Sequence, residues 1–400
     1  MPREITRYDV CAAVIGHLPF DARVWKEVTS LSEAGYSVKL IGNRYDISQT
    51  LRYSKDGIDV VEFPFGDRSG SGSKLEKIRS VMKVWLEATR TDAEVYHAHN
   101  IHTVPALMFA ARRRGARLIY DGHELNGEPA SSAIADRATA RVLWLSERFS
   151  VRKADVVITT NASRREALFK RHGREGIAIL PNVPRRVDEV NPVDPGFPEG
   201  APVLLYQGGI YAEQRAFRET IEALLELPDL HFVVLGFGRE RDLGLIKRWA
   251  SDYGVGERVH ILPPEPFDRL VHTAAKAQIG LVPLKATDLG CWLGDTNKLH
   301  EYLMAGVPVV GSAFPEVERV AVQGVPPVGE TFDPEDPSSI AAAVRRVLED
   351  PRYEERKLEA RRLALDEHNW EVASQVLLDI YRGLIDSPTS PNGALSTSPE

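Results

Sequence analysis

Short apolar runs of strand length alternate with helix-period stretches from the start of the chain to about residue 350. This alternation constrains the fold most, because it predicts parallel sheets with helices packed on both faces. The expected strands are Val10–Ile15, Val38–Ile41, Val60–Phe63, Val95–His97, Leu118–Tyr120, Val156–Thr159, Ile177–Leu180, Val203–Tyr206, Phe232–Leu235, His260–Leu262, Ile279–Val282 and Val307–Val310. A length of 400 residues with 43% apolar side chains predicts two such α/β domains.

A proline-rich segment, Pro181–Pro202, separates the two series of strands and carries no apolar periodicity. It predicts a stiff linker between domains. The expected division is an N-terminal Rossmann-like domain, a linker, a C-terminal Rossmann-like domain, a C-terminal helix and a disordered tail, at 1–185, 186–201, 202–368, 369–386 and 387–400. Two joined domains leave a cleft, and parallel sheets bind ligands at the carboxyl ends of their strands.

Several protein classes are disfavoured by composition. Cys11 and Cys291 provide neither a disulfide framework nor a metal-ligand spacing, which favours a reducing, cytoplasmic location. No apolar run approaches the roughly 20 residues of a membrane-spanning helix, and the first residues lack the apolar core of a signal peptide. A net charge of -7 argues against a general nucleic-acid binder.

The most specific local pattern is DTNKLHEYLMAGVPVV, residues 295–310, which predicts a helix followed by a strand. Its capping residue types and closing glycine are Asp295, Thr296, Asn297 and Gly306. A helix N-terminus offers unpaired N–H groups and a positive dipole end, which suit a diphosphate. Glu301, one turn in, is placed to accept hydrogen bonds from ribose hydroxyls. Alternatively, it only complements the dipole and forms an exposed i,i+3 pair with Lys298.

Glycine turns follow the first two expected strands of the second half. Gly208 and Gly209 let backbone approach a ligand, and the guanidinium of Arg215 shortly downstream suits phosphate oxygens. The second turn, at Gly236, lacks the last glycine of a dinucleotide fingerprint.

Two histidines, His97 and His99, end a strand of the first half and point the same way if the strand continues through both. With His102 or His123 they would suit a divalent metal and a metal-dependent hydrolase. The sequence shows no supporting carboxylate pattern for such a hydrolase, so we expect no metal there.

Taken in order, these segments resemble the retaining glycosyltransferases of family 4, which have the GT-B architecture. The resemblance spans nearly the whole chain and rests on residues 16–23, 34–38, 97–100, 180–183, 208–209, 297–303 and 305–310. It implies two Rossmann-like domains whose parallel sheets face each other across a cleft, with the C-terminal helix returning to the first domain.

The resemblance also implies a nucleotide-sugar donor and assigns residues to it. The catalytic residues would be His99, Arg215, Lys298 and Glu301. The donor-binding residues would be Gly16, Gly208, Gly209, Gly236, Ile261, Leu262, Trp292, Leu293, Thr296, Asn297 and Leu299. The acceptor side would hold Asp21, Arg23, His123 and Glu124, although Asp21 equally suits a helix N-cap. No metal or other cofactor is expected, and the acceptor would be a small molecule, a glycan or a lipid-linked sugar.

This sequence departs from the family pattern at three places. Leu293 stands where the family often has the first of two glutamates, and Gly209 stands where an arginine is frequent. The loop expected to face the sugar, residues 288–295, gives no readable specificity. A sugar-nucleotide epimerase of the same fold and a sugar-nucleotide-binding protein without catalysis therefore remain alternatives.

A basic amphipathic stretch, Lys74–Arg90, carries apolar residues at helical spacing. These residues are Leu75, Ile78, Met82 and Trp85. Such a helix can lie on an anionic membrane. We favour the other interpretation, in which the apolar stripe covers a sheet and the lysines face water.

Overall fold

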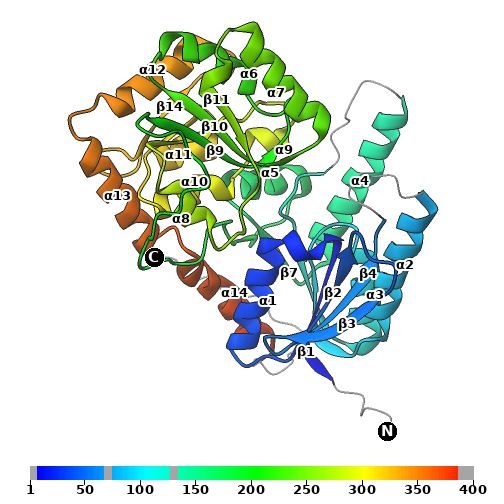
Figure 1. The fold of residues 1–400 in the computed structure, drawn as a ribbon. Helices are drawn as coiled ribbons and strands as arrows, with labels where there is room; N and C mark the ends of the chain where they lie inside the picture. The colour runs from blue at the N-terminus through cyan, green and yellow to red at the C-terminus, as the bar shows by residue number, and fades with distance from the viewer. Residues whose placement is uncertain (1–6, 67–73, 127–133, 386–400) are drawn as a thin grey trace.

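The computed structural model describes residues 7–66, 74–126 and 134–385, which form two α/β halves side by side (Figure 1). The N-terminal half is built on an eight-stranded sheet in the order β3-β4-β2-β1-β5-β6-β7-β8. Its strands are β1 Tyr8–His17, β2 Val38–Arg44, β3 Leu51–Lys55, β4 Ile58–Pro64, β5 Ala93–Ala98, β6 Arg117–Asp121, β7 Val156–Thr159 and β8 Ala178–Ile179. Only β3 runs antiparallel to its neighbour.

Helices cover this first sheet. They are α1 Ala22–Glu33, α2 Lys74–Arg90, α3 Val104–Arg114, α4 Ile134–Lys153 and α5 Ala162–His172, with a short 3-10 helix at Leu18–Phe20. Apolar residues of β1 and β5, such as Val10 and Val95, are fully buried. Because β1, β5 and β6 are parallel neighbours, their carboxyl ends meet at one edge of the sheet.

The C-terminal half has a six-stranded parallel sheet in the order β11-β10-β9-β12-β13-β14. Its strands are β9 Val203–Ile210, β10 His231–Gly238, β11 Val259–Leu262, β12 Ile279–Val282, β13 Val309–Ser312 and β14 Gly329–Phe332. Its helices are α6 Phe217–Ala223, α7 Glu240–Asp252, α8 Leu270–Ala274, α9 Leu289–Trp292, α10 Asn297–Met304, α11 Pro315–Ala321, α12 Pro337–Leu348 and α13 Tyr353–Asp366, with 3-10 helices at Leu224–Glu226 and Gly256–Arg258.

The last helix of the chain, α14 (Trp370–Ile385), returns to the N-terminal half and packs beside α1 (Figure 1). The Trp370 side chain is buried, and its indole N–H donates to the Ser30 hydroxyl at 2.8 Å. The chain thus crosses between the halves twice. At the first crossing, residues 180–202 contain no helix or strand.

The packing of α2 corrects the favoured interpretation of residues 74–90. Leu75, Ile78 and Met82 are 55%, 56% and 62% exposed, so these three residues do not cover the sheet, whereas Trp85 is half-buried and packs against the core. The buried positions are Val84 and Ala88, and also Ser80. No helix in the part of the chain that the structure describes is long and apolar enough to cross a membrane.

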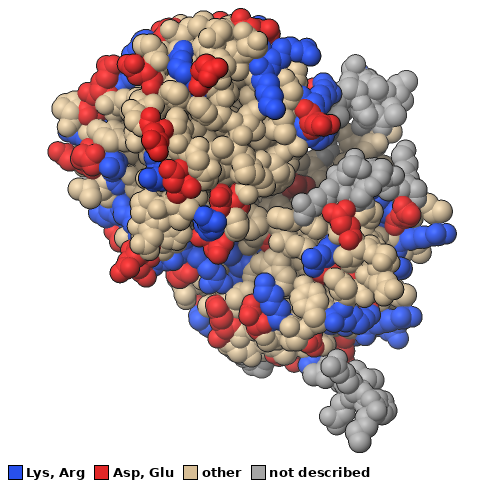
Figure 2. Space-filling view, in the orientation of Figure 1, with Lys and Arg blue, Asp and Glu red and all other residues tan. Residues whose placement is uncertain are grey.

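In the space-filling view a hollow separates the two halves on the right, and basic and acidic side chains are interspersed over the visible face (Figure 2). The carboxyl ends of the strands, where parallel sheets place their ligands, carry the residues singled out in the sequence.

Candidate active site

The ends of β9 and β10 come so close that only glycine fits between them. A Cβ on Gly236 would lie 1.9 Å from the carbonyl oxygen of Gly208. Gly208 itself has φ +121°, a conformation that residues with a Cβ rarely adopt. A Cβ on Gly208 would lie 3.7 Å from the Lys298 Nζ atom. The predicted glycine turn therefore brings bare backbone up to the lysine of the predicted helix start.

Helix α10 begins where the sequence predicted, with Thr296 as its N-cap residue. The Thr296 side chain makes no capping hydrogen bond, and its hydroxyl is buried without a partner among the described residues. At the other end, Gly306 has φ +70° and the Val307 N–H donates to the Tyr302 carbonyl, which closes the helix. Lys298, the second residue of α10, extends its side chain to the glycine turn at Gly208.

Two cations share this region. Lys298 is only 9% exposed, and its Nζ lies 5.0 Å from the centre of the Tyr206 ring. Burial and the nearby charge of Arg215 lower the pKa of Lys298 to about 7. Arg215 donates to the Gln214 carbonyl, while its buried Nε has no partner among the described residues. Within that part of the chain, neither Lys298 nor Arg215 forms an ion pair with a carboxylate.

Glu301 is held beside the cations. Its Oε2 accepts a hydrogen bond from the Gln207 side-chain amide at 2.5 Å. Burial raises the pKa of Glu301, and the charges of Lys298 and Lys26 act in the opposite direction. Lys26 belongs to α1, so a charge from the N-terminal half reaches this carboxylate. The exposed Lys298–Glu301 pair considered above is excluded, because Lys298 is buried.

The loop expected to face the donor sugar lies at the contact between the halves. Asp288 caps the short helix α9, and the Leu293 carbonyl accepts from the side-chain amide of Asn161 at 3.0 Å. Asn161 is the N-cap residue of α5, and Arg164 on the same helix donates to the Gly290 carbonyl at 3.0 Å. Trp292 is 39% exposed and packs against Phe314. Leu293 therefore connects the halves through its backbone, where the family pattern has a carboxylate side chain.

The other expected donor residues lie at or near the carboxyl ends of strands in the two sheets. Ile261 and Leu262 belong to β11, the edge strand next to β10. Gly16 lies near the carboxyl end of β1, and Gly209 lies near that of β9. Asn297 is exposed and Leu299 is fully buried, so only Asn297 presents its side chain at the surface.

Of the four residues expected on the acceptor side, two bond to groups within the N-terminal half and two are at least partly exposed to solvent. Asp21 caps α1, since its carboxylate accepts from the Val24 N–H at 3.1 Å. Arg23 is buried and pairs with Asp121 at 2.7 and 3.0 Å, so it lies inside the N-terminal half rather than on an open cleft floor. His123 is partly exposed and Glu124 is exposed.

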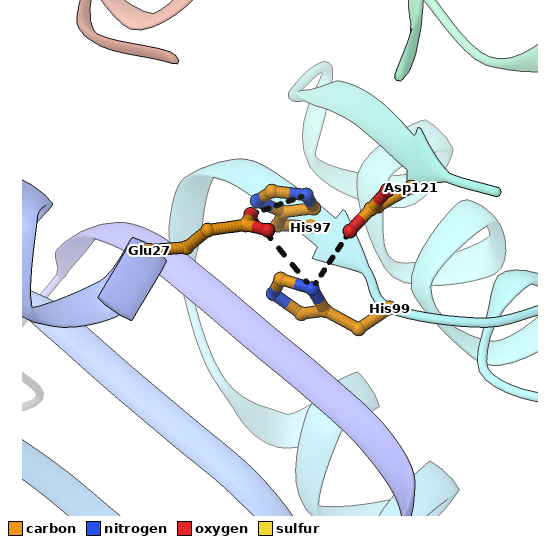
Figure 3. Close-up of side chains that lie close together, drawn as sticks. All are labelled: Glu27, His97, His99 and Asp121. Atoms are coloured by element: carbon orange, nitrogen blue, oxygen red, sulfur yellow. Dashed lines mark ion pairs between the residues drawn. The ribbon is translucent and has the colours of Figure 1, made fainter. Parts of the chain in front are cut away.

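His99 is fully buried in a cluster with His97, Glu27 and Asp121 (Figure 3). Its Nδ1 lies 3.5 Å from Asp121 Oδ2 and 3.9 Å from Glu27 Oε2. The expectation that both histidines point the same way is confirmed, because their rings stack 4.1 Å apart. Of the two histidines expected at the site, His99 is therefore buried inside the N-terminal half, whereas His123 is partly exposed.

Sequence reasoning missed Glu27, Lys26 and Gln207 as site residues. Glu27 had a visible signal: it is an acid on the face of α1 that also carries the buried residues Val24, Val28 and Leu31. Gln207, inside an apolar strand, had none.

The whole fold matches solved glycosyltransferase-type structures. Sucrose-phosphate synthase from Thermosynechococcus elongatus superposes with a TM-score of 0.74 at 17% identity, covering 94% of this chain and 99% of that one. Anabaena HepE in complex with UDP and glucose gives 0.64 at 13% identity, covering 93% and 99%. Two parallel-sheet domains joined in this way define the GT-B class of glycosyltransferases.

Family comparisons agree. Residues 21–183 match the model of the glycosyl transferase 4-like domain, and residues 201–350 match the model of glycosyl transferases group 1. D-inositol 3-phosphate glycosyltransferase 1 from Catenulispora acidiphila is 25% identical over 363 residues, which cover 83% of this chain and 82% of that protein. The chain belongs to the group 1 glycosyltransferases of family 4.

Proposed function

We propose that the protein transfers a sugar from a nucleotide-sugar donor to an acceptor hydroxyl with retention of anomeric configuration. The observation that carries this proposal is the pair of cations, Lys298 and Arg215, which have no carboxylate ion pair among the described residues and lie beside the N-terminus of α10. An anion with two negative charges would complement them, and a donor diphosphate has that charge.

In the proposed reaction, the bond between the sugar C1 and the diphosphate oxygen breaks, and a bond between C1 and the acceptor oxygen forms on the same face. The acceptor proton passes to the leaving phosphate. Lys298, Arg215 and the α10 N–H groups stabilise the developing charge, so that no metal ion is needed at the diphosphate. Glu301 accepts hydrogen bonds from the ribose.

UDP-glucose is the first donor to test, because structural neighbours include a complex of Anabaena HepE with UDP-glucose. Thermal stabilisation should be measured with UDP-, GDP-, ADP- and dTDP-sugars, followed by transfer assays with inositol phosphate and hexose phosphates. We expect one nucleotide series to stabilise the protein and support transfer without added Mg²⁺. Isomerisation of a donor without acceptor would indicate an epimerase, and stabilisation without transfer a binding protein.

We further propose that the exposed apolar stripe of α2 makes peripheral contact with an anionic membrane. Leu75, Ile78 and Met82 share one face of α2, the exposed Lys83 flanks this face, and α3 beside it exposes Phe109. Apolar side chains flanked by cations suit the interface of an anionic bilayer. A lipid-linked acceptor would be reached from this position.

A further inference from the structure

The cluster in Figure 3 brings four metal-ligand side chains together inside the N-terminal half. Glu27 comes from α1, His97 from the end of β5, His99 from the residue after β5, and Asp121 from the end of β6. One ligand atom of each lies within 4.8 Å of all the others, and all four residues are 0% exposed. The carboxylates absent from the sequence pattern around the histidines are thus supplied by two distant segments.

The distances within the cluster are too long for good hydrogen bonds. His97 Nε2 and Glu27 Oε2 are 3.7 Å apart, and the other ion-pair distances around His99 are 3.5 and 3.9 Å. Four ligands around a zinc-type ion at about 2.1 Å lie about 3.4 Å from one another. The spacings of 3.5, 3.7 and 3.9 Å need only a small contraction to reach that arrangement, whereas the most widely spaced ligand atoms, which lie within 4.8 Å of each other, need a larger one.

Several of these polar atoms are buried without a hydrogen-bond partner. They are Oε2 of Glu27, Nε2 of His97 and both ring nitrogens of His99, while Oε1 of Glu27 lies 3.0 Å from Arg23 Nε. A single such atom costs roughly 1–3 kcal/mol, so the three that lie near one another, Glu27 Oε2, His97 Nε2 and His99 Nδ1, require an explanation. A bound cation accepts lone pairs from several of them at once.

The charge of the surroundings also favours a cation. Arg23 pairs with Asp121 and with Glu27 Oε1 at 3.0 Å, so two carboxylates face one guanidinium. Arg23 leaves Glu27 Oε2 facing the histidines.

His97 is oriented as metal-binding histidines usually are. Its Nδ1 lies 2.9 Å from the hydroxyl of Tyr381 on α14, while Nε2 faces the cluster. When the second ring nitrogen is held by an outer partner in this way, the first presents its lone pair to a metal.

We propose that the protein binds one divalent transition-metal ion of the zinc type at Glu27, His97, His99 and Asp121. Two imidazoles and two carboxylates match the preferences of Zn²⁺ and Co²⁺ better than those of Mg²⁺ or Ca²⁺. The ion fastens α1 to the ends of β5 and β6, and so fixes Asp121 beneath His123, whose Nδ1 lies 3.5 Å from it. This site is separate from the diphosphate site, and its role is structural.

The test uses the full chain without a polyhistidine tag. The protein is stripped with EDTA, loaded with Zn²⁺ or Co²⁺, dialysed, and its bound metal measured by mass spectrometry. We expect about one ion per chain, a visible Co²⁺ absorption band from a low-symmetry site, and a Zn²⁺-dependent rise in Tm. Mg²⁺ should produce no rise. Less than stoichiometric retention of both metals by the native chain overturns the proposal.

Variants locate the ion. Glu27→Gln and His97→Gln should bind Zn²⁺ at least about tenfold more weakly, whereas His102→Gln, an exposed histidine of the same segment, should bind it as the native chain does. Equal binding by all three variants would place the ion elsewhere and refute the site. Where a variant fails to fold by circular dichroism, the Co²⁺ spectrum of the native chain decides. Because no donor is present, this result is independent of the transferase assays.

Discussion

Lys298, Glu301 and Arg215, the charged residues of the candidate site in the C-terminal half, differ in how firmly their side chains are fixed by neighbouring groups. Lys298 is fixed by burial against Tyr206, and Glu301 is fixed by its hydrogen bond from Gln207. Arg215 keeps a buried nitrogen without a partner. A ligand oxygen that reached this nitrogen would satisfy it, and such a contact adds binding energy without removing an existing bond.

We predict that Arg215→Ala and Glu301→Ala remain folded and turn over at least about a hundredfold more slowly, because each removes one fixed group from the developing charge or the ribose. Turnover is measured with the donor found in the panel, and folding by circular dichroism. Arg241→Ala is the matched control, since among the described residues Arg241 forms an ion pair with Glu213 alone, and that pair is exposed. Near-native turnover of either site variant removes that residue from the mechanism.

Donor binding should depend on pH through Lys298. Its pKa is lowered in the free protein and should rise when a diphosphate binds, so binding takes up a proton above about pH 7. Affinity for a nucleotide-sugar should therefore fall as pH rises from about 7 to 10, by at most about tenfold per unit. Calorimetry in buffers of different ionisation enthalpy measures this uptake. Lys298→Met should abolish it, and an unchanged uptake would contradict the assignment.

At the scale of elements, α14 is part of the N-terminal core although it ends the described chain. Trp370 is 1% exposed, and Leu377 and Tyr381 on the same face are also buried. The helix therefore ties residues 370–385 to α1, and its loss would uncover the core of the first sheet.

Trp370→Ala should lower the free energy of unfolding by about 3–5 kcal/mol, because it leaves a cavity and an unpaired Ser30 hydroxyl. Val372→Ala on the same helix, where Val372 is 49% exposed, should change it by less than about 0.5 kcal/mol. Urea unfolding followed by circular dichroism measures both. Equal small effects would show that α14 contributes little to the N-terminal half.

At the scale of the whole molecule, the exposed apolar side chains of α2 predict binding to vesicles containing anionic lipid. Co-sedimentation should fall when Ile78 and Met82 are changed to Ser, and should fall with added salt. Leu358→Ser is the control, because Leu358 is 72% exposed on α13 of the other half. Binding that is equal for neutral vesicles, or unaffected by the α2 changes, would refute the membrane contact.

The sequence alone determined most strands of both sheets and the bounds of α10. Strand-length apolar runs predicted every strand of both sheets except β3 and β14, since period and burial leave a direct record in the residues. These two were missed because LRYSK is largely exposed and GETF is short and polar. Capping residues and Gly306 predicted the bounds of α10, because helix ends are also marked by residue types close to them in the sequence.

Only the tertiary structure decided the surroundings of the histidines and the packing of α2. Glu27, Asp121 and Tyr381 reach His97 and His99 from segments far away in the sequence, and no local pattern encodes such contacts. The face of α2 that packs was also undecided, because both of its faces carry apolar residues. Local periodicity fixes which elements form, whereas burial and charge at a site depend on which elements meet.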